Sequence, residues 1–527
     1  MGILSITKKH QSLPYEISQE YKRYDQMQAV TMRIGWDPDI MAHVERFLNM
    51  RMGVTRRPGD HGFEDVDVAL ARGAWCLEDD AGGPMSGAGV GNQAFYSWDG
   101  EVFAHPATFD NLKQASAVVK QGARFLGASL VGISDYDERW VYTHSFNPIT
   151  KVHAPVEFPF TPKSIIVMAI EMNYEAYCTS SSYLSSAATG MGYGQMAVTA
   201  HRVANFIREL GYHAVPCGND TAMSIPLAIQ AGLGEISRLG LLVTPEFGPR
   251  VRLCKVITDL PLQADKPITF GVMNFCKTCM KCAEVCPANV ISKDREPSFK
   301  TVSPANNPGV KKWYNKVENC FKYWAVKVDC SACIASCPYN KPNTWTHRVG
   351  LRLAQTPAKG MLKWLDGVLG YGKTFDKAAM AHWWHDRPGV TEKNAAAGNQ
   401  GAAVTVSRAQ NREDNLVIQP TDTPADVFKA LSERLNRHPE RLSGVSALLQ
   451  FSLSGEHGGN WYVKLGGGQA EIGMAERPDA NATIEMKDSD FIAIVSKKLS
   501  PPAAMMSGRI RIRGEVSMAL KIRQIFR

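Results

Sequence analysis

The spacing of the cysteines constrains this chain more than any other feature, because one pattern recurs twice within a short segment. Eight of the 12 cysteines fall between residues 276 and 337. A C-x-x-C-x-x-C-x-x-x-C-P run is followed by a group that ends in C-x-x-C-x-x-x-C-P: Cys276, Cys279, Cys282 and Cys286, then Cys320, Cys330, Cys333 and Cys337. A dense cysteine block in a cytoplasmic protein is typical of metal binding. Zinc and a disulfide framework are the alternatives, but zinc sites usually pair C-x-x-C motifs over longer separations.

The two cysteine groups predict two 4Fe–4S clusters, because the first group has the spacing of bacterial two-cluster ferredoxins. Three cysteines at every third residue can converge on one cluster, and the fourth, which precedes a proline, is directed to the other cluster. The predicted ligands of one cluster are Cys276, Cys279, Cys282 and Cys337. The predicted ligands of the other are Cys286, Cys320, Cys330 and Cys333. Such clusters carry electrons without reacting with a substrate, so another part of the chain must receive the electrons.

A mixed core of strands and helices is predicted before the cysteines. Residues 164–170 form an unbroken apolar run, which indicates a buried strand. Residues 195–210 place apolar side chains at helical spacing, and Gly211 is suited to cap that helix. Residues 241–243 suggest another short strand. Strands that alternate with helices indicate an α/β (α+β) fold class.

Several motifs in this region resemble those of the corrinoid-dependent reductive dehalogenases. The match runs in order from about residue 160 to about residue 395, through these segments and the cysteine block: 189–193, 210–220, 231–240 and 244–253. The resemblance implies a nitroreductase-like core that encloses a base-off cobalamin, with a ferredoxin-like insert for the two clusters. No D-x-H-x-x-G motif occurs, which agrees with a cobalt that lacks a protein histidine ligand.

The same resemblance implies roles for individual residues. Tyr193 matches the proton-donating tyrosine, Arg252 the basic residue that supports it, and Asn219 a substrate-pocket asparagine. The further pocket and cofactor-binding residues are Thr189, Trp324, Phe247, Gly248 and Pro249. Reductive cleavage of a carbon–halogen bond leaves a carbanion-like centre that needs a proton. A tyrosine is mostly protonated at neutral pH, and a nearby arginine stabilises the tyrosinate that remains.

The predicted function is therefore reductive dehalogenation of an organohalide by cob(I)alamin. Two 4Fe–4S clusters relay the electrons from an external donor (a ferredoxin, a flavodoxin or a reductase), and Tyr193 gives the proton. One alternative is an epoxyqueuosine-reductase-like corrinoid enzyme, whose family acts on transfer RNA and has an aspartate in the acid position. Another is a non-catalytic electron-transfer or lipid-carrier protein.

The remaining residues divide into further regions. Residues 394–419 are rich in Ala, Gly and Asn and lack apolar periodicity, so they are predicted to be a linker. The order of helices and strands in 420–527 resembles that of sterol-carrier-protein-like domains, which implies a site for an apolar ligand. The other predicted regions are an N-terminal region on the core, the core, the ferredoxin-like domain and a closing segment of the core: 1–150, 151–260, 261–345 and 346–393.

Composition adds expectations about location and partners. The chain has 527 residues, of which 44% are hydrophobic and 21% are charged, as in ordinary globular proteins. It has no apolar run of about 18 residues, so no membrane span is expected. The first residues lack the apolar stretch of a secretory signal, so a cytoplasmic location is expected. The net charge of +8 is mild for this length, and no nucleic-acid partner is expected.

Overall fold

The computed structural model describes residues 7–43, 61–79, 94–342, 344–369, 371–375, 380, 383–384, 422–437, 446–466, 469–496, 498–499 and 501–514. The predicted linker at 394–419 lies outside these residues. The chain forms two compact units, and each is described by itself: Met1–Arg33 with Arg57–Gly401, and Ile34–Arg56 with Ala402–Arg527. Within the described residues, no helix combines the length and the apolar character needed to cross a bilayer.

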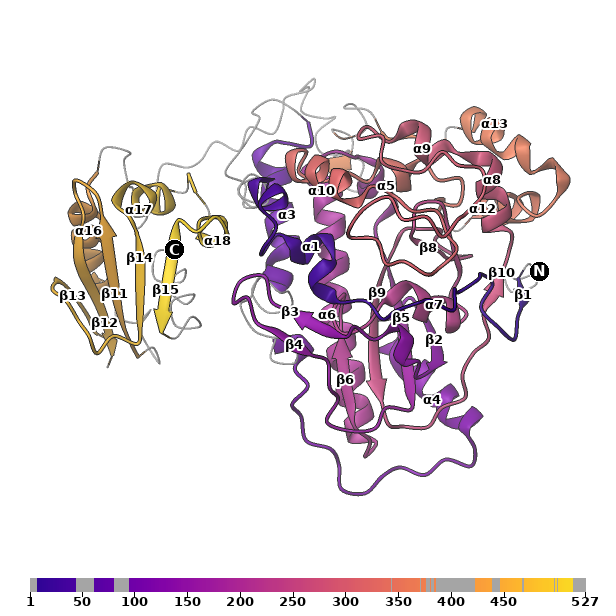
Figure 1. The fold of residues 1–527 in the computed structure, drawn as a ribbon, viewed down its shortest axis with the longest axis horizontal. Coiled ribbons are helices and arrows are strands. Elements are labelled where there is room, and N and C mark those ends of the chain that lie inside the picture. The colour runs from indigo at the N-terminus through magenta and orange to yellow at the C-terminus, as the bar shows by residue number, and fades with distance from the viewer. Residues whose placement is uncertain are drawn as a thin grey trace, which may run out of the picture. The chain divides into compact units, whose positions relative to one another are not determined.

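A four-stranded antiparallel sheet forms the centre of the first unit (Figure 1). Its strands, in spatial order, are β2 (Leu130–Asp135), β5 (Ser164–Glu171), β9 (Val251–Thr258) and β6 (Ala214–Cys217). Strand β5 is buried from its first residue to Ile170, as the unbroken apolar run predicts for a central strand. The predicted strand and the mixed fold class are confirmed.

The first strand of this sheet, β2, comes from the region 1–150, which was predicted to lie outside the core. Strand β2 pairs with β5 through Leu130 opposite Ala169 and Ile133 opposite Ile166. The predicted boundary at residue 150 therefore divides the sheet. The sequence of β2 is short and contains Gly132, whose added Cβ would meet the Ala231 carbonyl oxygen. A glycine inside a short strand weakens its apolar pattern.

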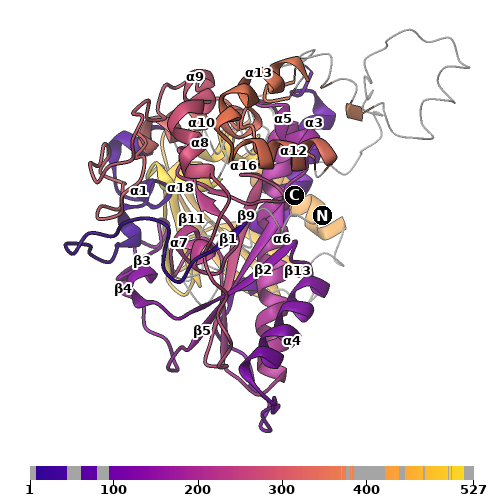
Figure 2. The same ribbon diagram turned by 90° about the vertical axis from the view of Figure 1, so that its right-hand side faces the viewer.

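Helices cover both faces of the sheet (Figure 2). Helices α4 (Leu112–Phe125) and α6 (Tyr183–Glu209) pack against one face, and α7 (Ser224–Gln230) packs against the other. Side chains alternate along each strand. Cys254 and Val256 of β9 pack on the α4 and α6 side, so even-numbered positions of this strand face α6.

Helix α6 is longer than the sequence predicted, because it begins at Tyr183 and not near residue 195. Its N-cap is Ser182, whose side chain accepts from the Ser185 amide in a capping box. It ends before Gly211, which has a φ of +84° as expected for a residue that terminates a helix. The first half of α6 consists mostly of small residues, which carry little apolar periodicity.

Those small residues allow helix α3 (Asp65–Leu77) to approach α6 closely. A Cβ at Gly190 would lie within 2.9 Å of the Trp75 ring. The Trp75 indole N–H donates to Ser186 Oγ at 3.1 Å. The N-terminal region thus packs directly on the helix that carries Tyr193.

The cysteine block forms short helices beside the sheet: α8 (Val272–Cys279), α9 (Lys281–Val285), α10 (Val317–Val326) and α11 (Ala332–Ala335). The closing segment adds α12 (Trp345–Leu353), η7 (Pro357–Gly360) and α13 (Met361–Val368). The buried guanidinium of Arg238 holds the block together by donating to the carbonyls of Cys276, Ser292 and Asp294.

Several short elements complete the first unit. The paired ones are β1 (Lys8–Lys9) with β10 (Ile268–Thr269), β3 (His144–Phe146) with β4 (His153–Pro155), and β7 (Glu235–Ile236) with β8 (Leu242–Val243). The helical ones are η2 (Gln26–Gln28), α1 (Val30–Arg33), η5 (Ala94–Tyr96), η6 (Glu138–Trp140) and α5 (Tyr174–Cys178). Strand β8 confirms the predicted strand at 241–243.

The second unit is a five-stranded sheet with helices. Its spatial strand order is β13 (Gln469–Met474), β12 (Gly459–Gly466), β11 (Ala447–Ser454), β14 (Ala482–Lys487) and β15 (Ile510–Gly514). Its helices are α16 (Pro424–Arg437), α17 (Asp488–Val495) and α18 (Pro501–Met506). The Phe428 ring of α16 stacks on Trp461 at 4.8 Å and on Phe491 at 5.1 Å. The core of this unit is therefore rich in aromatic rings.

Candidate functional site

Tyr193, Arg252 and Asn219, the three predicted catalytic residues, lie together at the edge of the core sheet. Tyr193 comes from α6, Arg252 from β9, and Asn219 from the loop after β6. The Arg252 guanidinium donates from Nη1 to the Tyr193 hydroxyl oxygen at 3.2 Å, and the Asn219 amide donates to the same oxygen at 3.2 Å. Arg252 reaches α6 because it occupies an even-numbered position of β9, and Gly192 leaves room for its side chain.

The phenol oxygen of Tyr193 is thus an acceptor for two N–H donors. A phenol oxygen has two lone pairs and one O–H donor. Both lone-pair directions are used, so the hydrogen of the phenol points away from Arg252 and Asn219. The arrangement can release that proton to a third group and can stabilise the oxygen once it is negative.

The charge of Arg252 is supported by its surroundings. Burial disfavours the charged form, but nearby phenolic and acidic groups raise the pKa of the guanidinium above its ordinary value: Tyr193, Tyr177, Asp329 and Glu78. The Cζ atom of Arg252 also lies 4.3 Å from the centroid of the Tyr193 ring. Arg252 therefore stays cationic directly beside the phenol.

The N-terminal region contributes two residues that sequence reasoning missed. The Trp75 ring stacks on the Tyr193 ring, with centroids 5.3 Å apart and an interplanar angle of 28°. The Tyr96 hydroxyl is buried, and a Cβ at Gly218 would meet it at 2.8 Å. Burial and then Glu78 raise the pKa of Tyr96 well above its ordinary value. Both residues lie before the segment that carries the motifs, so no motif signalled them.

Two buried polar atoms near Tyr193 have no hydrogen-bond partner in the described part of the chain. They are the Tyr96 hydroxyl and Nε of Arg252. A buried polar group without a partner costs free energy, so native proteins usually provide one. These two atoms could form hydrogen bonds with a polar group of a bound ligand.

Thr189 and Trp324, the predicted pocket residues, meet at a third residue that sequence reasoning missed. The Asp329 carboxylate accepts from Thr189 Oγ1 at 3.1 Å and from the Trp324 indole at 2.5 Å. It also accepts from the backbone amide of Cys330 at 2.8 Å. Burial raises the pKa of the Asp329 carboxyl, and the bonds from Trp324, together with Arg252, only partly offset that effect. Asp329 thus joins the helix of Tyr193 to the cysteine block.

Phe247, Gly248 and Pro249 form a turn that contacts Thr244 and the backbone of Tyr339. Thr244 and Gly248 exchange backbone hydrogen bonds, and Phe247 donates from its amide to Thr244 Oγ1 at 3.1 Å. Gly248 has a φ of +59°, and a Cβ there would lie 2.2 Å from the Tyr339 carbonyl oxygen. The turn therefore packs against the segment that follows Cys337, and its role toward a corrinoid stays a prediction.

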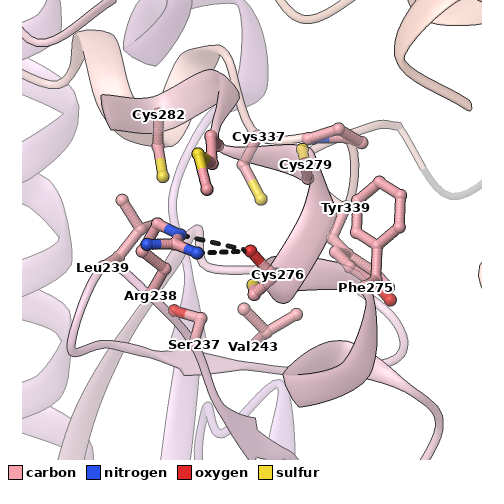
Figure 3. A pocket seen from close by; sticks show the side chains of 12 residues that line it. Ser237, Arg238, Leu239, Val243, Phe275, Cys276, Cys279, Cys282, Cys337 and Tyr339 are labelled. Carbon is pink, nitrogen blue, oxygen red and sulfur yellow. Dashed lines mark hydrogen bonds between the residues drawn. The ribbon is translucent and has the colours of Figure 1, made fainter. Parts of the chain in front are cut away.

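The cysteines of the first predicted cluster surround one cavity (Figure 3). This cavity is lined by Cys276, Cys279, Cys282 and Cys337, together with Arg238 and Tyr339 among others. Figure 3 shows the sulfur atoms of the four cysteines directed toward a shared space. Burial raises the pKa values of Cys276 and Cys282 to about 12. Four thiols around one cavity are the donor set that a 4Fe–4S cluster needs.

The other four cysteines also lie near one another. Cys333 is influenced electrostatically by Cys320, Cys330 and Cys286, and by Cys282 of the first group. Burial raises the pKa of Cys320 to about 12, with further effects from Cys330 and Cys286. This set could hold a second cluster beside the first. None of the 12 cysteines, all of which lie in the described residues, forms a disulfide.

Comparisons with known protein families match three parts of the chain. A model described as "Reductive dehalogenase subunit" matches residues 148–262. A "4Fe-4S double cluster binding domain" matches residues 275–340, and the "SCP-2 sterol transfer family" matches residues 428–527. The predicted cluster domain and the sterol-carrier-like domain are thereby confirmed as domain types.

Individual relatives agree with these matches. The tetrachloroethene reductive dehalogenase of Desulfitobacterium hafniense is 38% identical over 372 residues, which cover 58% of this chain and 67% of that protein. The enzyme of the same name from Sulfurospirillum multivorans is 33% identical over 345 residues, covering 58% of this chain and 68% of the relative.

A solved reductive dehalogenase, whose structure concerns B12-dependent dehalogenation, shares the fold with a TM-score of 0.56 and 23% identity. The match covers 72% of this chain and 50% of that protein, so this chain spans about half the length of the solved structure. The relative from Desulfitobacterium hafniense is 38% identical and is matched over two thirds of its length. The chain therefore belongs to the reductive dehalogenase family, which is a family of oxidoreductases.

Proposed function

We propose that this protein is a cobalamin-dependent enzyme that replaces a halogen of an organohalide by hydrogen. Bound base-off cobalamin would supply the reduced cobalt that cleaves the carbon–halogen bond. The residues around Tyr193 fit such a site, since two buried polar atoms there lack partners and the phenol is held by two donors. Thr189, Trp324, Phe247, Gly248 and Pro249 are the residues we propose to line or hold the cofactor.

The observation that carries this proposal is the pair of hydrogen bonds received by the Tyr193 oxygen. Arg252 and Asn219 use its lone pairs, and the phenolic hydrogen is left for a substrate carbon that has lost its halide. Proton transfer from a positioned side chain is a common source of catalytic rate. Arg252 and Asn219 then stabilise the tyrosinate without moving, because both donors already point at the oxygen.

Electrons reach this site through the two sets of cysteines. Asp329 contacts Thr189, which lies one helical turn before Tyr193, and is bonded to the amide of Cys330. We therefore propose that the cluster on Cys286, Cys320, Cys330 and Cys333 is the nearer one to Tyr193. The cluster on Cys276, Cys279, Cys282 and Cys337 then passes electrons to it from an external donor, which we propose to be a ferredoxin, a flavodoxin or a reductase.

The C-terminal domain is proposed to hold an apolar ligand. Its family model is named for sterol transfer, and its core contains the stacked rings of Phe428, Trp461 and Phe491.

Relatives of the catalytic part are named for tetrachloroethene, which is an apolar organohalide. An apolar organohalide is accordingly the substrate class that we propose for this chain, in a cytoplasmic enzyme.

The test is anaerobic production of the full chain with cobalamin supplied, followed by metal analysis and an assay for halide release. We expect about eight iron atoms per chain if both clusters assemble, and one cobalt. With a low-potential reductant, halide should be released from an apolar organohalide in proportion to the cobalt content. Protein that holds cobalt and iron but releases no halide from any of a panel of chlorinated and brominated alkenes and phenols would contradict the proposal.

A further inference from the structure

A cluster of two imidazoles and a carboxylate lies on the β3–β4 hairpin, apart from the site of Tyr193 and from the cysteines. Ligand atoms of Asp25, His144 and His153 all lie within 4.8 Å of one another. Asp25 comes from the N-terminal segment, whereas the two histidines come from the two strands of the hairpin. None of these residues takes part in the proposed dehalogenation.

The three side chains are held in place by their surroundings. The hairpin loop is closed by Asn147, whose Oδ1 accepts from the amides of Ile149 and Thr150. The segment of Asp25 is fixed to the hairpin on both sides. The Thr143 amide donates to the Tyr24 carbonyl at 2.9 Å, and the Phe146 amide donates to Gln26 Oε1 at 3.1 Å. A site built on such fixed elements needs little rearrangement to bind an ion.

The distances within the cluster suit a metal ion with short bonds. Nε2 of His153 lies within hydrogen-bond distance of both Asp25 oxygens, 2.9 Å from Oδ2 and 3.1 Å from Oδ1, and a metal ion would bridge this pair in place of the shared proton. Zinc bonds to histidine nitrogen and carboxylate oxygen are about 2.0–2.2 Å long, which puts neighbouring ligand atoms of a tetrahedron about 3.3 Å apart. The His144 and His153 rings lie 4.7 Å apart between centroids, and the ligand atoms of all three residues lie within 4.8 Å of one another.

His144 gives a second reason to expect a ligand. Within the described residues its imidazole nitrogens have no hydrogen-bond partner, and its recorded contact is the ring of His153. The ring is partly exposed, so an ion can reach it from solvent. Two imidazoles and a carboxylate are a donor set that borderline divalent metals prefer.

We infer that Asp25, His144 and His153 form a binding site for a divalent transition-metal ion such as Zn²⁺. The three ligands leave one tetrahedral position for water. The bound ion links the N-terminal segment to the β3–β4 hairpin, so it stabilises this part of the molecule. The site is independent of the proposed dehalogenase chemistry, because it shares no residue with the phenol site or the cysteine block.

The experiment is equilibrium dialysis of the cluster-loaded full chain against Zn²⁺, with iron measured on the same sample so that zinc in the cysteine sites is detected. The wild-type chain should bind one Zn²⁺ that does not displace iron. Asp25→Asn keeps a good N-cap for η2, and His144→Phe keeps a ring against His153. Each should lower the Zn²⁺ affinity at least ten-fold, and the wild-type rise in melting temperature with Zn²⁺ should disappear.

The matched control is His213→Gln. His213 also pairs with a carboxylate, since its Nδ1 lies 2.8 Å from Asp259 Oδ2, but no third metal-ligating side chain joins them in the part of the chain that the structure describes. This variant should bind Zn²⁺ as the wild-type chain does. The inference would be wrong if the wild-type chain bound no Zn²⁺ beyond its cysteine sites, or if His144→Phe and Asp25→Asn retained wild-type affinity.

Discussion

Arg252 contacts Tyr193 in two ways, since its Nη1 donates to the phenol oxygen at 3.2 Å while its Cζ lies 4.3 Å from the centroid of the ring. The cation thus packs on the ring that it also hydrogen-bonds. A change at either residue alters both charge and packing, so variants that separate the two effects are the most informative.

Tyr193→Phe keeps the ring and its stacking on Trp75 but removes the O–H group. If Tyr193 gives the proton, halide release should fall by about 10²–10⁴-fold, the usual contribution of general acid catalysis. Cobalt and iron contents should not change. Tyr212→Phe is the control, because the Tyr212 hydroxyl donates to the Ala107 carbonyl away from the site, and its rate should stay at the wild-type level. Wild-type turnover in Tyr193→Phe would show that the proton comes from elsewhere.

Arg252→Lys and Arg252→Met separate charge from shape. Lysine keeps the cation but lacks the planar guanidinium, so it should reduce turnover less than methionine, which keeps only the apolar bulk. Steady-state rates of both variants, at verified cobalt content, measure the difference. Equal losses in the two variants would mean that the guanidinium geometry, and not its charge, is what the reaction needs.

Two variants of Asp329, which links α6 to the cysteine block, separate the effect of its charge from the effect of its hydrogen bonds. Asp329→Asn retains an oxygen for Trp324 and the Cys330 amide, and the Thr189 hydroxyl can reverse to accept from the new amide group. Asp329→Ala leaves these donors unpaired and should lower the free energy of unfolding by about 1–3 kcal/mol. We expect Asp329→Asn to keep eight irons and lose turnover, and Asp329→Ala to lose stability as well. Denaturant unfolding and iron analysis distinguish the two.

In the crossed ligand assignment, the last cysteine of each motif binds the cluster of the other motif, so substitutions of Cys286 and Cys337 should remove different clusters. Cys286 belongs to the first sequence motif, yet Cys286→Ala should remove the cluster shared with Cys330 and spare the one at the cavity of Cys276. Cys337→Ala should do the reverse. Each should lose about four irons, and electron paramagnetic resonance of the reduced protein should show which signal remains. Cys254→Ala, in the buried core of β9, should keep both. Loss of the same signal in Cys286→Ala and Cys276→Ala would refute the crossing.

His347 predicts a pH dependence of stability. Its Nε2 lies 2.7 Å from the Pro245 carbonyl oxygen, and burial lowers the pKa of the imidazole to about 4. The unfolded chain therefore takes up this proton first, and the contribution of His347 is present above pH ~6.5 and lost as the pH falls toward 4. The loss between pH 7 and pH 5 should be about 2 kcal/mol. Denaturant unfolding of His347→Gln at pH 7 and pH 5 should show a decrease in the free energy of unfolding that is smaller than the wild-type decrease by about 2 kcal/mol.

The sequence predicted those parts of the molecule whose pattern is local. The apolar run of β5, the capping Gly211 and the cysteine spacing are each defined by residues close together in the sequence. Tyr193, Asn219 and Arg252 were predicted because three separate segments resemble those of a known family. Trp75, Tyr96 and Asp329 could not be found in that way. They reach the site through the packing of α3 and η5 and through a side chain that precedes Cys330, and packing between distant segments leaves no periodic signal. An acidic residue directly before a cluster cysteine was the one available hint.

Gly248 has a consequence for how such a protein can change over evolutionary time. The turn of the core touches the backbone of Tyr339 and Asn340 so closely that no Cβ fits at position 248. Tyr339 lies two residues after Cys337, one of the cysteines at the cavity. Any larger residue at 248 would displace that backbone and would carry a sulfur atom with it. A cluster domain exchanged from a relative would therefore need a turn that fits the backbone after its own last cysteine.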